Sequence, residues 1–395
     1  MHITPFSVSR LPRIEFGSGT FDKIPTLARS FGTHVLLVTG AHSFRATAHW
    51  PRLLDAFRAL GLTWRDIQIH GEPSPQWIDE AVQAYRDAQI DVVVGIGGGS
   101  ALDAAKAIAG LLRPGNSVMD HLEGVGPELA YVGPSAPFIA VPTTAGTGSE
   151  ATKNAVLSVQ GTDGFKKSFR DEKLVAEYAV IDPDLLASCP PGVIAANGMD
   201  AFTQLLESYV SSRAMPMTDS LAWGGMKAVR DGLLVLYADS GDADARDKMA
   251  YAAMVSGITL AQVGFGSVHG LAAPLGAFFP IPHGVVCGTL VADATRINIQ
   301  AMQARDPANP ALEKYALVGR LLSKQQNLSQ ADAHTILIES LKGWTSALAL
   351  PRLGHYGVRA ADTARIVGSS RGSSMKTNPV RLDDSEIAEL IAARL

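Results

Sequence analysis

The feature that most constrains the fold is an apolar, β-branched run at residues 90–96, which leads directly into three consecutive glycines and a helical pattern. Similar short apolar runs occur at 34–39, 63–70, 137–141 and 179–181, and helical periodicity separates them at 50–61, at 78–88 and from about residue 100. This alternation is typical of βαβ units with parallel strands. The first half of the chain is therefore predicted to be an α/β domain with a parallel, Rossmann-like sheet.

The second half has few strand signals. From about residue 185 it is rich in Ala, Leu and Met at helical periods, and breaks are expected at five prolines: Pro216, Pro274, Pro280, Pro282 and Pro351. A chain of 395 residues also exceeds what one hydrophobic core usually serves. We therefore expect two domains, an α/β domain over 1–184 and an all-α domain over 185–395.

Composition and charge restrict the class of partner. Apolar residues make up 47% of the chain and the formal net charge is −4, so nothing electrostatic favours a nucleic acid or an anionic membrane. Residues 1–17 lack the pattern of a signal peptide, and no uncharged apolar run approaches about 18 residues. Cys189 and Cys287 are interpreted as free structural thiols, which is typical of a cytoplasmic protein.

A glycine-rich turn follows the 90–96 run. Gly97, Gly98 and Gly99 allow the main chain to approach a ligand closely, and Ser100 and Asp103 are expected to cap the helix that begins there. Because amides at a helix start carry partial positive charge, this turn is predicted to bind a phosphate. The alternative is a plain tight turn, and the motif is not the usual GxGxxG.

A second turn, at 142–150, is rich in hydroxyl groups and follows the predicted strand at 137–141. Ligands of open α/β sheets bind at the carboxyl ends of the strands. We therefore expect this turn to bind a ribose, a pyrophosphate or a carboxamide, unless it is only a surface loop stabilised by Ser/Thr turns. The hydroxyls concerned belong to Thr143, Thr144, Thr147 and Ser149.

Metal-ligand residue types gather in the second half. Asp200 and Gln204 lie one helical turn apart on a predicted helix, and His269 and His283 lie in apolar, glycine-flanked segments. A carboxylate with two neutral imidazoles is a suitable ligand set for Zn²⁺ or Fe²⁺. The alternative for each histidine is a hydrogen-bonded core residue, because the sequence does not show whether these side chains converge.

Taken together, these motifs resemble the iron-type (group III) alcohol dehydrogenases over nearly the whole chain. The resemblance implies a dehydroquinate-synthase-like fold, a homodimer or larger oligomer, and one divalent metal, Fe²⁺ or Zn²⁺. It also implies a nicotinamide dinucleotide bound by the glycine motif with Asp103 and Lys106, and by the stretch at 142–150. The implied metal ligands are Asp200, position 204, His269 and His283.

Two positions depart from the family pattern. The family often has His where this chain has Gln204, and an amide oxygen is a weaker ligand than imidazole. Many members also have a His, thought to assist proton relay, where this chain has Ala273, so the proton acceptor is unassigned. The similar glycerol dehydrogenases hold Zn²⁺ with one Asp and two His, whereas the similar maleylacetate reductases work without metal.

The cofactor preference is inferred from residues 38–45. NAD-preferring members of the family have an Asp after the first strand, whereas this chain has Gly40, with Ser43 and Arg45 nearby. These residues are compatible with a 2′-phosphate, so NADP(H) is expected over NAD(H). Lys166 resembles the family lysine that approaches the cofactor ribose, although a solvated surface charge is the alternative.

The expected function is hydride transfer between NAD(P)(H) and a small alcohol, aldehyde or ketone at a divalent metal. One alternative is a metal-independent reductase like the maleylacetate reductases. Another is a dehydroquinate-synthase-like lyase, which would require clustered Lys and Arg side chains around 200 or 269–283, where we see none. A non-catalytic nucleotide-binding protein is the third.

Overall fold

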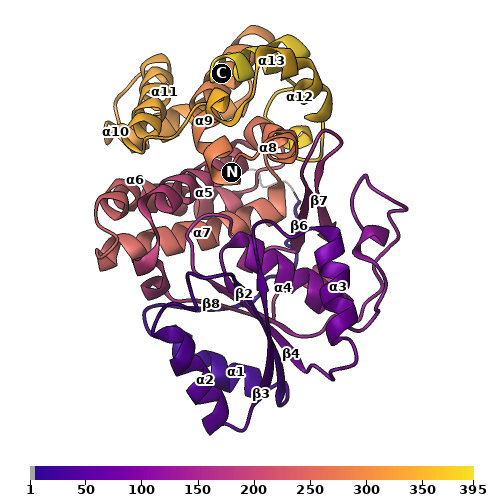
Figure 1. Cartoon of the computed structure of the whole chain (residues 1–395). Coiled ribbons are helices and arrows are strands. Elements are labelled where there is room, and N and C mark those ends of the chain that lie inside the picture. Colours follow the sequence, from indigo (N-terminus) through magenta and orange to yellow (C-terminus); the bar gives the residue numbers. More distant parts are fainter. Residues whose placement is uncertain (1–4) are drawn as a thin grey trace. The chain divides into compact units, whose positions relative to one another are not determined.

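The computed structural model describes residues 5–395, and the chain forms two compact units (Figure 1). The α/β unit comprises residues 9–159 and 164–189, and the helical unit comprises 190–395 with the short segments 5–8 and 160–163. Residues 1–4, which belong to the stretch interpreted above as lacking a signal peptide, lie outside the described residues.

The α/β unit is built on a six-stranded sheet in the order β1-β8-β5-β4-β2-β3, and every neighbouring pair is parallel. The central strands β4 and β5 are buried at every position, because helices cover both faces of the sheet. This confirms the predicted α/β fold class. The strands are β1 (Arg13–Phe16), β2 (His34–Gly40), β3 (Thr63–Ile69), β4 (Val92–Gly97), β5 (Phe138–Pro142) and β8 (Tyr178–Ile181).

Two hydrophobic clusters flank this sheet. One contains side chains of α3 and α4, and the other contains side chains of α1 and α2. The sheet is therefore the middle layer of three, as expected for βαβ units. The helices are α1 (Ile24–Arg29), α2 (His49–Ala59), α3 (Pro75–Tyr85) and α4 (Gly99–Leu111), with short 3-10 turns at Thr20–Lys23, Val118–Asp120, Ser149–Ala151, Glu172–Leu174 and Pro183–Ser188.

Three strands were not expected from the sequence. The edge strand β1 has four residues and none of them is buried, so it lacks an apolar run. Strands β6 (Asn154–Val159) and β7 (Phe165–Arg170) form a separate antiparallel hairpin. Two lysines in the middle of β7 interrupt its hydrophobic pattern, which is why periodicity did not reveal the hairpin.

The helical unit contains only helices as regular structure among its described residues, which confirms the predicted all-α second half. Its α-helices are α5 (Pro191–Val210), α6 (Pro216–Ala238), α7 (Ala243–Val263), α8 (Ser267–Phe278), α9 (His283–Arg305), α10 (Pro310–Ser323), α11 (Gln330–Ala347), α12 (Thr363–Ser369) and α13 (Asp384–Ala392). Further 3-10 turns lie at Leu353–Tyr356, Ala360–Asp362 and Met375–Thr377.

Four of the five prolines lie at helix starts or in connections, but the break expected at Pro274 is wrong. Pro274 lies inside α8 and is buried. A proline in a helix removes one hydrogen bond to the carbonyl four residues earlier, here Gly270. The remaining turns of this buried helix tolerate that loss, so the helix continues to Phe278.

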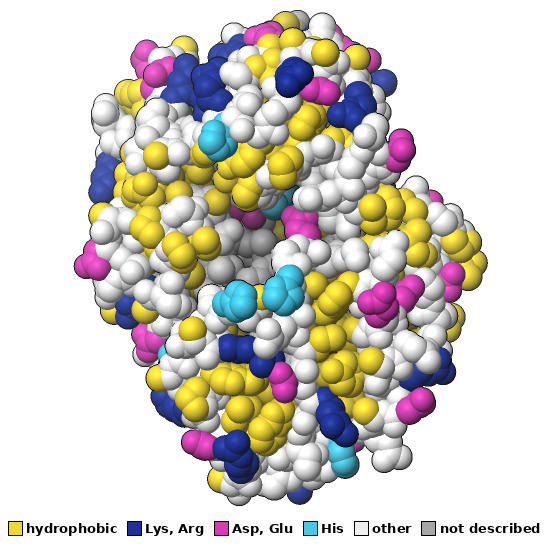
Figure 2. All heavy atoms as spheres, viewed as in Figure 1, with side chains coloured by type: hydrophobic (Ala, Val, Ile, Leu, Met, Phe, Trp, Pro, Cys, Tyr) yellow, Lys and Arg dark blue, Asp and Glu magenta, His cyan; other side chains and the backbone are white. Residues whose placement is uncertain are grey.

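The charged side chains on the surface and the hydropathy of the helices both agree with what the composition of the chain indicates. Figure 2 shows basic and acidic side chains interspersed over the visible face. Among residues 5–395, no single helix is long and apolar enough to cross a membrane, although α7 and α8, bent by 101° at their junction, pass that length and composition test as a pair.

Helix α9 lies very close to α5 because of two glycines in its first two turns. A Cβ atom on Gly284 would lie 2.4 Å from the carbonyl oxygen of Ala196, and one on Gly288 would lie 2.7 Å from Cβ of Met199. Both neighbours belong to α5, and any larger residue would force the helices apart. The glycines therefore bring the first turns of α9 against the part of α5 that carries Asp200.

A buried lysine, Lys106 on α4, holds the hydroxyl-rich turn at 142–150 in place. The Nζ atom of Lys106 donates to the backbone oxygens of Ser149 and Asn154, both at 2.7 Å, and to the Thr152 hydroxyl at 2.9 Å. Burial lowers the pKa of Lys106 to about 8, and the charges of Asp103 and Glu150 oppose that shift. The position of the 142–150 turn thus depends on one buried cation.

The first prediction concerns Gly284. Gly284→Ala places a methyl group against the Ala196 backbone and is expected to lower the free energy of unfolding by about 1–3 kcal/mol. The control is Gly343→Ala, in the exposed middle of α11 with open space around it, which should raise stability by about 0.5–1 kcal/mol. Chemical denaturation measures both, and equal effects of the two variants would contradict the close approach.

The second prediction concerns Glu150, which is buried beside Lys106. Burial raises the pKa of Glu150 to about 7, against the lowering effect of its own backbone and of Lys106. The folded chain therefore keeps this proton to higher pH than the unfolded chain does. The associated stability is fully present below the ordinary carboxyl pKa and is lost as pH rises through about 7.

Glu150→Gln removes this titration. Between about pH 5 and about pH 8 the wild type should lose up to about 3 kcal/mol of unfolding free energy relative to Glu150→Gln. Denaturation at a series of pH values measures the difference, and Glu80→Gln on the exposed side of α3 is the control. If the difference in unfolding free energy between the wild type and Glu150→Gln stays constant with pH, the raised pKa of Glu150 is contradicted.

Candidate functional site

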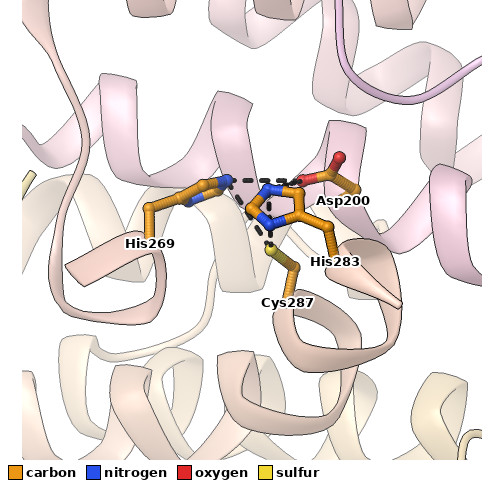
Figure 3. A group of neighbouring side chains, drawn as sticks. All are labelled: Asp200, His269, His283 and Cys287. Carbon is orange, nitrogen blue, oxygen red and sulfur yellow. Dashed lines mark hydrogen bonds and ion pairs between the residues drawn. The ribbon is translucent and has the colours of Figure 1, made fainter. Parts of the chain in front are cut away.

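Four side chains of the helical unit form a compact cluster (Figure 3). Asp200 comes from α5, His269 from α8, and His283 and Cys287 from α9, and their ligand atoms all lie within 4.8 Å of one another. Oδ1 of Asp200 lies 3.3 Å from Nε2 of His269 and 3.8 Å from Nε2 of His283. The structure thus brings together three residues that the sequence proposed as metal ligands.

Cys287 belongs to this cluster, which sequence reasoning missed by treating it as an isolated structural thiol. Its Sγ atom lies 3.6 Å from Nε2 of His269 and 3.8 Å from Nε2 of His283. The available signal was its spacing, since Cys287 follows His283 by one helical turn and so lies on the same helix face.

Gln204 occupies the position one turn after Asp200, as expected, but its amide oxygen has another partner. That oxygen accepts a hydrogen bond from the Ser256 hydroxyl at 2.8 Å, and both residues are buried. This bond occupies one of the two lone pairs of the Gln204 oxygen and fixes the side chain by its contact with Ser256. The role of Gln204 as a fourth ligand is therefore not favoured by the local hydrogen bonding.

His269 is held in a fixed orientation. Its Nδ1 atom lies 2.7 Å from Oε2 of Glu207, and the other oxygen of that carboxylate accepts from the Val268 amide at 2.7 Å. The Phe265 ring stacks on the imidazole at 3.8 Å. A carboxylate on one ring nitrogen fixes which way the other nitrogen faces. Sequence reasoning missed Glu207, although it lies two turns after Asp200 on α5.

The cluster is an electron-rich set of donors, of which all but the half-buried His283 are buried. Burial alone would raise the pKa of Asp200, but the imidazoles of His283 and His269 lower it to about 2. Burial raises the pKa of the Cys287 thiol to about 12, against the lowering effect of His269. Oδ2 of Asp200 is buried without a hydrogen-bond partner among residues 5–395. Such a set fits a divalent cation, which satisfies these atoms at once.

Ala273 lies one turn after His269 on α8 and is half-buried. Its methyl group cannot accept a proton. The relay histidine that the resemblance implies therefore has no counterpart at this position, as the sequence indicated.

In the α/β unit, the glycine turn joins β4 to α4 as predicted, but the expected capping by Ser100 and Asp103 is wrong. The N-cap is Gly98, and no side chain among the described residues caps the helix. The Asp103 carboxylate instead accepts from the Ser149 hydroxyl at 2.5 Å. The helix start thus keeps its partial positive charge without a side-chain oxygen to offset it.

The glycine turn and the 142–150 turn pack directly on each other. A Cβ atom on Gly98 would lie 3.2 Å from the Thr144 hydroxyl, and one on Gly99 would lie 2.7 Å from Cγ2 of Thr147. The Thr143 amide also donates to the Gly97 carbonyl at 2.9 Å. Part of the requirement for glycine here is therefore contact between the two turns rather than contact with a ligand.

The four predicted hydroxyl residues of this turn differ in their surroundings. Thr143, Thr144 and Thr147 are half-buried, whereas Ser149 is buried and its hydroxyl contacts Asp103 and Lys106. Ser149 therefore shapes the turn through internal hydrogen bonds. The three threonines remain at the edge of the turn.

The residues proposed to contact the 2′-phosphate of the cofactor lie at the carboxyl end of β2. Gly40 is the last residue of that strand, with open space around it, and Ser43 is exposed. The Arg45 guanidinium lies 4.3 Å from the Trp50 ring and contacts Asp66 at 2.6 Å. Arg45 is thus a cation held in place at this edge by its neighbours.

Lys166 lies on β7 and forms an ion pair with Glu72. Its side chain is only 10% exposed, which differs from the solvated surface charge that the sequence left as an alternative.

Two family models match the chain. "Iron-containing alcohol dehydrogenase" matches residues 12–183, and "Fe-containing alcohol dehydrogenase family, C-terminal" matches residues 194–395. A solved structure of 1,3-propanediol oxidoreductase is similar with a TM-score of 0.88 and 26% identity, over 99% of this chain and 100% of that one. The likeness therefore extends over the α/β unit and the helical unit.

Curated relatives agree with these matches. A long-chain-alcohol dehydrogenase of Geobacillus thermodenitrificans is 32% identical over 89% of this chain and 87% of its own length. An NAD-dependent methanol dehydrogenase of Bacillus methanolicus is 28% identical over 96% and 97% of the two chains. An NADPH-dependent butanol dehydrogenase of Clostridium saccharobutylicum is 27% identical over 96% of each. The chain belongs to the iron-containing alcohol dehydrogenase family.

Proposed function

We propose that this chain transfers a hydride between a nicotinamide dinucleotide and a small alcohol, aldehyde or ketone, with a divalent metal held by Asp200, His269 and His283. The observation that supports the metal site best is the convergence of these side chains from three helices. When bound, a divalent metal acts as a Lewis acid on the substrate oxygen. Glu207 positions His269 for this role through its bond to Nδ1.

The dinucleotide pyrophosphate is proposed to bind at the start of α4, against Gly97, Gly98, Gly99 and Ser100. The absence of a side-chain cap supports this, because the helix start then offers its amides to an anion. Asp103 and Lys106 contribute indirectly by holding the 142–150 turn through Ser149. Contacts to the cofactor are proposed for Thr143, Thr144, Thr147 and Lys166.

NADP(H) is proposed as the preferred cofactor. Gly40 supplies no carboxylate that would repel a 2′-phosphate, and Ser43 and Arg45 lie near it in sequence. The Trp50 ring and Asp66 hold the Arg45 side chain at this edge, and a 2′-phosphate would share its charge with the Asp66 carboxylate. The similar proteins include an NAD-dependent and an NADPH-dependent enzyme, so the preference is an inference from these residues.

A metal-independent reductase is the second candidate, and the hydrogen bond from Ser256 to Gln204 is the observation that favours it. A lyase acting on a phosphorylated substrate has less support, because the side chains in contact with the cluster include Glu207 and Phe265, which do not attract phosphate. We also propose a homodimer or larger assembly, from the family resemblance, and a cytoplasmic location, from the two free thiols.

The third prediction tests the metal. The purified chain should contain about one equivalent of Fe²⁺ or Zn²⁺ by elemental analysis, and chelation should abolish alcohol oxidation until metal is restored. Asp200→Asn should lose the metal and at least ~100-fold of the activity, while NADPH binding, measured by fluorescence, persists. The exposed Asp244→Asn is the control and should keep both metal and activity. Full activity in metal-free protein would favour the metal-independent reductase.

The fourth prediction tests the cofactor preference. Gly40→Asp places a carboxylate in open space at the end of β2, so the fold should tolerate it. Repulsion of the 2′-phosphate should then lower the ratio of NADPH to NADH specificity, measured as kcat/KM, by at least ~10-fold. Ser43→Ala removes only a hydroxyl and should lower the ratio less. A wild type that already prefers NADH would overturn the proposal.

A further inference from the structure

We propose that Cys287 is the fourth ligand of the metal site, which makes the donor set Asp–His–His–Cys and favours Zn²⁺ over Fe²⁺. This inference rests on the metal site of the proposed function and goes beyond it in the ligand and in the metal selected. The observation that supports it is that the Cys287 sulfur lies close to the Asp200 carboxylate and to the imidazoles of His269 and His283 (Figure 3).

Four of the six distances between donor atoms suit the coordination shell of one divalent cation, and a substrate oxygen would join it as a fifth ligand. Typical Zn–N, Zn–O and Zn–S bond lengths place two N or O ligands roughly 3.3 Å apart, and an N and an S ligand roughly 3.6 Å apart. The two carboxylate–imidazole distances here are 3.3 and 3.8 Å. The two sulfur–imidazole distances are 3.6 and 3.8 Å. The other two pairs, Asp200 with Cys287 and His269 with His283, lie within 4.8 Å, so all four donor atoms surround one common point.

Cys287 and His283 are positioned by the same helix, α9. The two residues lie one turn apart on α9, so their side chains emerge on the same helix face. Gly284 and Gly288 follow them directly and allow α9 to approach the backbone of α5. The thiol is therefore held against Asp200 by the packing of two long helices rather than by a loop.

The charges of the ligands equal that of a divalent cation. Binding of a metal would displace the thiol proton to solvent, so the ligands become one carboxylate, one thiolate and two neutral imidazoles. The buried Glu207 carboxylate adds one further negative charge beside His269, which also favours a cation at this site. Gln204, a neutral amide whose oxygen is bonded to Ser256, adds no charge on the other side.

The donor chemistry points to zinc. Thiolate is a soft ligand that favours Zn²⁺ over the harder divalent ions, whereas carboxylate and imidazole alone accept Fe²⁺ and Zn²⁺ alike. Replacing an imidazole by a thiolate in a four-ligand set therefore shifts metal selection within the same fold.

The test uses Co²⁺ as a probe, because a cobalt ion bound to thiolate shows a charge-transfer absorption in the near ultraviolet. Metal-free full-length protein is titrated with Co²⁺, and the bound metal is counted by elemental analysis. The wild type is expected to bind one Co²⁺ with this band. Cys287→Ala and Cys287→Ser should lose the band and bind Zn²⁺ at least ~100-fold more weakly, beyond the ~10–100-fold typical for outer-shell losses.

Cys189→Ala is the matched control, since Cys189 is the other free thiol and lies in the α/β unit. It should keep both the band and the affinity for Zn²⁺. Thermal unfolding of each metal-free variant shows whether it is folded, and Cys287→Ser supplies a folded variant of nearly equal size if Cys287→Ala is not.

The outcomes separate this inference from the proposed function. Wild type that binds one Co²⁺ without the band, or Cys287→Ser that retains the band, overturns ligation by Cys287 while metal-dependent activity stands. Equal affinity ratios of Zn²⁺ to Fe²⁺ in wild type and Cys287→Ser overturn the metal selection. Wild type that binds no Co²⁺ and stays active after chelation overturns the proposed metal site itself.

Discussion

The close packing of α9 against α5 is the constraint on which the cluster of Asp200, His269, His283 and Cys287 depends. The four residues of the cluster come from three helices and are up to 87 positions apart in sequence, from Asp200 to Cys287, so helix packing brings them together. Gly284 and Gly288 set the distance, because each lies where a side chain would meet α5. The buried polar atoms then face one another instead of the apolar core. Burying polar groups costs free energy unless they are hydrogen-bonded or paired, and the apolar packing around the cluster offsets this cost.

A different kind of interaction organises the α/β unit. There, one buried cation, Lys106, fixes the hydroxyl-rich turn by hydrogen bonds to its backbone, and the glycines of the preceding turn let the two turns touch. In this chain, many of their side chains serve each other: Asp103 contacts Ser149, and Gly99 makes room for Thr147. The shape of the proposed cofactor site is thus determined before any ligand binds.

Much of the fold could be predicted from the sequence because its buried strands are continuous apolar runs and its second half has helical periodicity. The exceptions have local reasons: β1 has no buried residue, and Lys166 and Lys167 interrupt the pattern of β7. The three proposed metal ligands were identifiable by residue type, but their convergence depends on tertiary packing. Cys287 was missed because an apolar context suggested core burial. Cys287 is indeed buried, but burial alone does not reveal that its neighbours are two histidines.

The arrangement around His269 has a consequence for how such a site can change. One ring nitrogen faces Asp200 and the other faces Glu207, and both carboxylates project from α5. The imidazole is therefore tied at both ends to a single rigid element, and its direction is independent of what the opposite wall of the cluster contains. The opposite wall is α9, which carries His283 and Cys287, so a change of donor there leaves the two contacts of His269 with α5 in place. The orientation of His269 is thus set by α5 alone, whereas the donors supplied by α9 are set by a separate helix.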